Sequence, residues 1–163
     1  MMRERGLMAF IILILLGCAF YGGYLVGNDS SGGQSEKQAP TVQSQWIKEG
    51  KPPIPAVSVD GVPMKVKLSS YSWCEPTGSD TASCQSVDAS IAQMEPVVAK
   101  GGSLINIEAP ERIKELTLIN MSKGFTGDSY YVPKAKGIYQ YSIHCERFLD
   151  QGQAEYYFAV EVE

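Results

Sequence analysis

Hydrophobic residues follow two different patterns along the chain. Residues 7–27 form an apolar run without a single charge. As a helix this run would be roughly 31 Å long at ~1.5 Å per residue, enough to cross the hydrocarbon core of a membrane. From residue 56 onward, short apolar stretches alternate with polar residues and are separated by Gly, Pro and Asp. The pattern predicts one transmembrane helix followed by a β-rich domain.

A polar stretch separates these two parts. Residues 28–55 are rich in Gly, Ser, Gln and Pro, and a segment of this composition buries too little apolar surface to offset its ordering entropy. We therefore expect an anchor over residues 1–27, a flexible stalk over 28–55 and a domain over 56–163. Trp46 and Ile47 are apolar exceptions in the stalk, which dock on the domain, lie at the membrane surface, or are stray apolar residues of a disordered stalk.

The residues around the apolar run indicate how it is oriented and processed. Arg3 and Arg5 precede it, so the positive-inside rule puts the N-terminus in the cytoplasm and the domain outside. Residues 15–18 (LLGC) look like a lipobox, with Cys18 as the lipidated residue, but the chain stays apolar beyond Cys18. This favours an uncleaved anchor over a lipoprotein signal or a cleaved secretory signal. All three routes export the same domain.

The domain reads as a series of short strands. Asp60 and Gly61 separate two extended runs and suit the type I′ turn of a β-hairpin, whose second strand would be residues 62–68. Further strands are expected over residues 103–108, 115–121, 129–132, 137–148 and 154–162. Residues 87–94 could form one or two turns of helix. About seven strands joined by Gly, Pro and Asp turns predict a mainly β, two-sheet sandwich.

Local motifs make this expectation more specific. The GIYQY sequence of residues 137–141 resembles the tyrosine corner of immunoglobulin-like sandwiches, which implies that the Tyr139 hydroxyl bonds back to the preceding loop. The order SYSWC, PVVAKGGS, PKAKGIYQY and YYFAVEV is similar to a group of uncharacterised envelope proteins of Gram-positive bacteria, membrane-anchored or lipoprotein-like. The resemblance covers about residues 57–162. It implies an immunoglobulin-like domain outside a single-pass anchor in the cell membrane, and no activity.

Three cysteines lie beyond the apolar run. Cys74 and Cys84 bracket a polar loop, and an exported domain sits where disulfides form, so we expect these two to pair. Strand alternation puts Cys145 on the apolar face with Tyr141 and Ile143, which predicts a buried free thiol. The alternative is a bridge from Cys145 to either of the other two cysteines.

The charge argues against one class of partner. From residue 54 onward the chain has nine Lys and Arg against fourteen Asp and Glu, a net charge of −5. Nucleic-acid binding needs a basic surface, so no nucleic-acid partner is expected.

Few residues could carry catalysis or hold a cofactor. His144 is the one histidine, and its neighbour Cys145 points to the opposite face of the strand, so the two cannot form a nucleophile–base pair. We expect no enzyme, no cofactor and no metal site. A copper site built from Met64, Met94, Met121 and His144 is the weaker alternative, because methionines at such positions usually pack in cores.

We therefore predict a non-enzymatic protein-interaction module of the bacterial cell envelope, with an envelope protein as its partner. Its binding surface would be Trp73 in the loop of residues 73–84, or Phe125, Tyr130 and Tyr131. Aromatic residues on loops supply contact area at low entropic cost. The competing interpretations are that these aromatics complete the core, that the domain carries a small ligand or copper, or that it inhibits an envelope protease.

Overall fold

The computed structural model describes residues 41–78, 80–90 and 94–163. These residues contain nine strands and two 3₁₀ turns, and no α-helix. The strands are β1 (Ala56–Val59), β2 (Val62–Pro63), β3 (Lys67–Pro76), β4 (Ala82–Val87), β5 (Val97–Val98), β6 (Ile105–Glu108), β7 (Ile113–Asn120), β8 (Gly137–Arg147) and β9 (Gly152–Val162). The expected anchor over residues 7–27 and the candidate lipidation residue Cys18 lie outside the described residues. Within the described ranges, no helix is long and apolar enough to cross a membrane.

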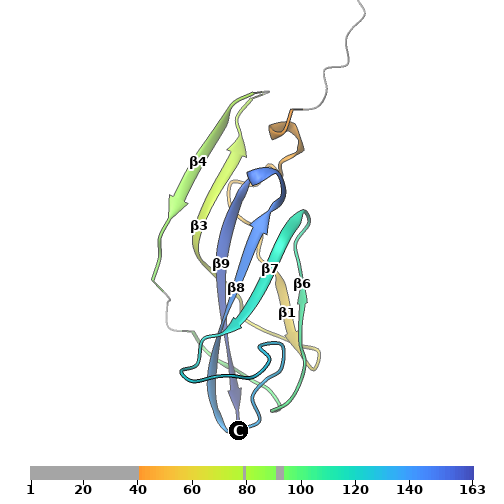
Figure 1. The fold of residues 1–163 in the computed structure, drawn as a ribbon, viewed down its shortest axis with the longest axis vertical. Helices are drawn as coiled ribbons and strands as arrows, with labels where there is room; N and C mark the ends of the chain where they lie inside the picture. Colours follow the sequence, from red (N-terminus) through yellow and green to blue (C-terminus); the bar gives the residue numbers. More distant parts are fainter. Residues whose placement is uncertain (1–40, 79, 91–93) are drawn as a thin grey trace, which may run out of the picture. The chain divides into compact units, whose positions relative to one another are not determined.

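The strands form two sheets that enclose one core (Figure 1). The smaller sheet has the order β2-β1-β6, and the larger has the order β4-β3-β9-β8-β7, with β5 pairing in parallel with the end of β9. The core side chains include Val57, Val59, Ile105, Tyr141, Ile143, Tyr156, Phe158 and Val160. The rings of Tyr141 and Phe158 are stacked at 4.8 Å between centroids. The prediction of a mainly β, sandwich-like domain is confirmed.

The first hairpin forms where the sequence predicts it, but its second strand is shorter. Asp60 and Gly61 both have positive φ, +49° and +78°, as a type I′ turn requires. The expected continuous strand over residues 62–68 is wrong: β2 ends at Pro63, and β3 begins at Lys67 in the other sheet. Pro63 stands at a non-bonded position of the ladder, where no N–H toward β1 is needed, and one further bond follows, from the Met64 N–H to the Val57 carbonyl at 2.8 Å, before the chain crosses to the other sheet.

Two further expectations are corrected. Residues 129–132 contain no strand and contribute only an isolated bridge between Leu104 and Tyr131. The helix expected over residues 87–94 is not found, because Val87 ends β4 and residues 88–90 have no regular structure, while residues 91–93 lie outside the description.

The long C-terminal hairpin and its tyrosine corner follow the sequence. Strands β7, β8 and β9 begin and end within two residues of their expected bounds. The Tyr139 hydroxyl donates a hydrogen bond to the Ala135 carbonyl at 2.8 Å, back to the preceding loop. Residues Leu149 and Asp150 adopt positive φ and reverse the chain between β8 and β9.

All three cysteine assignments in the domain are confirmed. Cys74 and Cys84 form a disulfide between directly paired residues of β3 and β4. Cys145 is a free thiol, 2 % exposed. Its burial raises the pKa of the thiol to about 11 from 9.0.

The expected stalk does not extend to residue 55. The Gln151 side chain forms two hydrogen bonds with the backbone of Ile47, one as acceptor and one as donor, at 3.1 and 2.7 Å. The Tyr156 hydroxyl donates to the Pro53 carbonyl at 2.7 Å, and Pro55 is buried. The folded unit therefore begins before residue 56, and of the alternatives left open for Trp46 and Ile47 the structure shows docking on the domain.

We predict that removing the disulfide loosens β4 before the rest of the fold. All six side chains of β4 are exposed, so apart from this bridge the strand is held by backbone pairing and by two side-chain hydrogen bonds, from Gln85 to the Gly50 carbonyl and from Ser86 to the Ser72 hydroxyl. The double variant Cys74→Ala/Cys84→Ala should lose about 2–3 kcal/mol of unfolding free energy on the loop-entropy model. Urea denaturation checks this, with Ser83→Ala as the control on the same strand. An unchanged free energy would contradict the role given to the bridge.

Alkaline pH should destabilise the domain through its buried acids. Burial raises the pKa of Cys145 to about 11 and that of Tyr141 to about 12. Because the folded state holds these protons more tightly, its stability is complete below the unfolded thiol pKa near 9 and falls as pH rises toward 11 and above. Melting temperatures measured from pH 8 to 11 should fall, and Cys145→Ala should flatten the first part of the decline. A curve that is flat over this range would refute the linkage.

Candidate functional site

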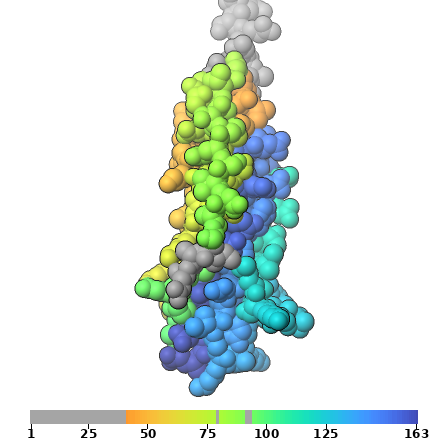
Figure 2. All heavy atoms as spheres, turned by 90° about the vertical axis from the view of Figure 1, so that its left-hand side faces the viewer, coloured from red at the N-terminus to blue at the C-terminus, as the bar shows by residue number. Residues whose placement is uncertain are grey.

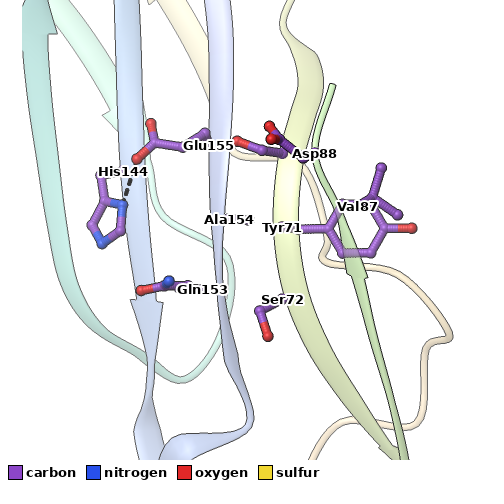
Figure 3. Close-up of a pocket in the computed structure, with 9 residues that line it drawn as sticks. Tyr71, Ser72, Val87, Asp88, His144, Gln153, Ala154 and Glu155 are labelled. Carbon is purple, nitrogen blue, oxygen red and sulfur yellow. Dashed lines mark hydrogen bonds and ion pairs between the residues drawn. The ribbon is translucent and has the colours of Figure 1, made fainter. Parts of the chain in front are cut away.

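The outer face of the larger sheet carries a polar cluster. Successive side chains of β8 point to opposite faces of the sheet. Ile143 and Cys145 belong to the core, so Ser142 and His144 point away from it. His144 pairs directly with Glu155 of β9, and its Nδ1 lies 2.6 Å from Oε1 of that carboxylate (Figure 3). The Ser142 hydroxyl donates to the other carboxylate oxygen at 2.7 Å.

This cluster does not have the geometry of nucleophilic catalysis. Glu155 lies between the serine and the histidine and accepts from Ser142, so the hydroxyl is bonded to a carboxylate and not to an imidazole. A nucleophilic hydroxyl needs a base within hydrogen-bond reach. Here Glu155 occupies the place beside Ser142 where the His144 imidazole would have to lie. The arrangement is that of a cross-strand histidine–glutamate hydrogen bond with a hydroxyl bonded to the same carboxylate.

A shallow hollow of about 200 Å³ adjoins the cluster. Its lining residues are Ser70, Tyr71, Ser72, Val87, Asp88, His144, Gln153, Ala154 and Glu155. Sites that enclose small molecules usually measure about 300–1,000 Å³ and are mainly apolar. This hollow is smaller than that range and does not support the small-ligand alternative, whereas a second, mainly apolar hollow of about 420 Å³ beside Val59, Val98 and Val162 falls within it.

The four residues of the copper alternative are not brought together either. Met64 and Met94 are buried, at 7 % and 8 % exposure. Met121 donates its backbone N–H to Gln140, which is four residues from His144 along β8, or about 13 Å at the strand rise. Among the described residues, no group of three or more His, Cys, Asp and Glu could hold a metal ion.

Trp73 is not a surface residue. Its side chain is 1 % exposed, and its indole N–H donates to the Glu49 carbonyl at 2.7 Å. The Arg147 guanidinium lies over the ring, 5.3 Å from its centroid, in cation–π contact. The prediction that Trp73 belongs to a binding surface is therefore wrong, because the ring completes the interior where the N-terminal segment docks.

The other predicted aromatics are exposed to different degrees. Tyr130 and Tyr131 are 39 % and 49 % exposed, and Leu104, which bridges to Tyr131, is 44 % exposed. Phe125 is half-buried, and its ring packs so closely over Gly127 that a Cβ there would lie 2.9 Å away. We call Leu104, Tyr130 and Tyr131 the tyrosine surface.

Hydrogen bonds hold this surface in one conformation. The N–H of Tyr130 donates to the Asp128 side chain at 2.9 Å, and the N–H of Tyr131 donates to the Asp128 carbonyl at 3.1 Å. The Tyr130 carbonyl accepts from Ile105, and Val132 and Ser103 are joined through their backbones at 2.9 Å. The segment is thus attached to residues 103–105, at and just before the start of β6.

The tyrosine surface and the N-terminal segment lie at opposite ends of β8. The loop that carries the two tyrosines leads into β8 at Gly137, whereas the Trp46 indole donates to Leu149, just beyond the other end of β8. Ten steps along a strand measure roughly 33 Å. Figure 1 shows the 121–136 loop beside the C-terminus and the docked segment at the tip of the β8–β9 hairpin.

No protein-family model matches the chain, and neither a curated protein nor a solved structure matches it. The function must therefore be inferred from the residues themselves.

Proposed function

We propose that this protein is a non-enzymatic interaction module of the bacterial cell envelope, anchored in the membrane by residues 7–27, with an immunoglobulin-like domain outside. The domain binds an envelope protein through the tyrosine surface. The observation that carries the proposal is a pair of half-exposed tyrosines whose backbone is already fixed by hydrogen bonds.

A fixed pair of tyrosines is suited to protein recognition. Tyrosine offers a large amphipathic ring with few rotatable bonds, so little side-chain entropy is lost on contact. Because Asp128 and β6 already order the backbone of Tyr130 and Tyr131, binding does not have to order it. Leu104 adds an apolar side chain beside them, which gives the surface a hydrophobic centre.

The position of the surface agrees with display from a membrane. With the anchor at residues 7–27, the chain enters the folded unit at the end where Gln151 and Leu149 hold it. The tyrosine surface lies at the other end of β8, where it faces away from the point of attachment. The Tyr139–Ala135 hydrogen bond supports the immunoglobulin-like assignment, although the sheets here have six and three strands instead of the usual four and three.

Photo-cross-linking in the native host tests the proposal. A cross-linking amino acid at Tyr131 of the full chain should capture one discrete protein. The same probe at Phe148, an equally exposed aromatic at the other end of β8, is the matched control and should capture none. No capture from Tyr131, or equal capture from both positions, would refute the tyrosine surface as the binding site.

The captured partner then allows a test of energetics. Tyr130→Ser/Tyr131→Ser should weaken its binding at least about tenfold, the effect of losing aromatic contacts at the centre of an interface. The melting temperature should stay nearly unchanged, because both rings are substantially exposed. Loss of stability together with binding would show that the rings serve the fold.

A further inference from the structure

Strand β4 is an open edge of the larger sheet. It pairs only with β3, and all six of its side chains are exposed. Figure 2 shows this strand, in yellow-green, running uncovered over the face of the molecule toward the viewer. Its sequence, ASCQSV, contains no charged residue and no proline. Natural sheets usually protect edge strands with charges, prolines, bulges or covering loops.

The other described edges have such protection. Strand β7 carries Lys114 and Glu115 beside a register shift, and its last N–H, from Asn120, donates to the Ser129 hydroxyl. Strand β6 is covered at its start, where Ile105 donates to the Tyr130 carbonyl. Strands β2 and β5 are each only two residues long, and β2 ends in a proline. The lack of protection on β4 is therefore specific to that strand.

The hydrogen-bond phase of the β3–β4 hairpin shows which groups face outward. The Thr77 N–H donates to the Thr81 carbonyl across the hairpin. Cys74, which pairs with Cys84, instead donates its N–H away from β4, to the Gln151 carbonyl. Paired residues of an antiparallel ladder alternate between bonded and non-bonded positions. The N–H and C=O groups of Ala82, Cys84 and Ser86 consequently point away from β3, in register to pair with one more strand.

The charged residues within the hairpin itself are all acidic. Residues 69–89, which contain the whole of β4 and most of β3, include Glu75, Asp80 and Asp88 and no Lys, Arg or His. Such a hairpin attracts a basic segment. It disfavours pairing of two copies of this chain through β4, which would bring like charges together.

We infer that the free edge of β4 binds an extended, lysine- or arginine-containing segment of a partner protein by strand addition, at a second interface separate from the tyrosine surface. Main-chain hydrogen bonds to Ala82, Cys84 and Ser86 provide the affinity, and the acidic residues of the hairpin select for basic side chains. The disulfide keeps β4 in the sheet, so the edge is presented in an ordered form.

Defined peptides and hydrogen exchange test this inference on the full chain in detergent micelles. The probe is a ten-residue peptide of alternating Val and Lys, and its counterpart has Glu in place of Lys. The lysine peptide should slow amide exchange at Ala82, Cys84 and Ser86, and the glutamate peptide should not. Ser86→Pro removes an outward N–H that β3 does not use and should weaken binding at least about tenfold, with Ser86→Ala as the matched control.

Three results would overturn the inference. One is that neither peptide protects the β4 amides. Another is that the lysine peptide binds Ser86→Pro as well as Ser86→Ala, or that its backbone N-methylated form, which cannot pair, binds equally well. The comparison with the N-methylated peptide uses the unchanged protein, so it remains valid even if Ser86→Pro disturbs the hairpin. The last is a concentration-dependent dimer that Ser86→Pro abolishes, because β4 would then serve a second copy. Retained peptide binding in Tyr130→Ser/Tyr131→Ser keeps this test separate from that of the tyrosine surface.

Discussion

The arrangement of the domain depends on the side chain of Gln151. This side chain is 2 % exposed and joins three parts of the chain that are far apart in sequence. Its amide forms two hydrogen bonds with the backbone of Ile47 and donates a third to the Cys74 carbonyl at 3.2 Å. The Gln151 carbonyl accepts from the Cys74 N–H at 2.9 Å. A buried amide whose donors and acceptor are all used is favourable, whereas one left unpaired would cost about 1–3 kcal/mol.

The interior around Gln151 shows why Trp73 is buried while Tyr130 and Tyr131 are exposed. Arg147 is 2 % exposed, and burial lowers the pKa of its guanidinium. It lies over the Trp73 ring and donates to the Glu111 carbonyl. A desolvated cation needs such partners, so Trp73 is committed to the fold at this end. Of the aromatics predicted to form a binding surface, Tyr130 and Tyr131 at the other end are the exposed ones.

Much of the fold can be predicted from sequence, because local signals and burial agree there. The Asp60-Gly61 turn, the alternation of β8 and the Cys74–Cys84 bridge each follow from neighbouring residues. The docking of residues 46–55 could not be predicted, since it depends on Gln151, about a hundred positions away, and a polar composition favoured a stalk. The burial of Trp73, one of the two interpretations that the sequence left open, could not be decided for the same reason. The open edge of β4 depends on which strand pairs with β9, which periodicity does not specify.

The two proposed interfaces and the connection to the anchor use different parts of one small domain. The Gln151 end fixes where the chain enters, the opposite end presents the tyrosine surface, and the disulfide-bonded hairpin presents a strand edge along the side. The first of these depends on the N-terminal segment being an integral part of the fold. Amide hydrogen exchange at Ile47 in the full chain tests this most directly. We predict protection comparable to that of the β8 amides, and loss of that protection in Gln151→Ala; exchange at the rate of an unstructured peptide would contradict the account.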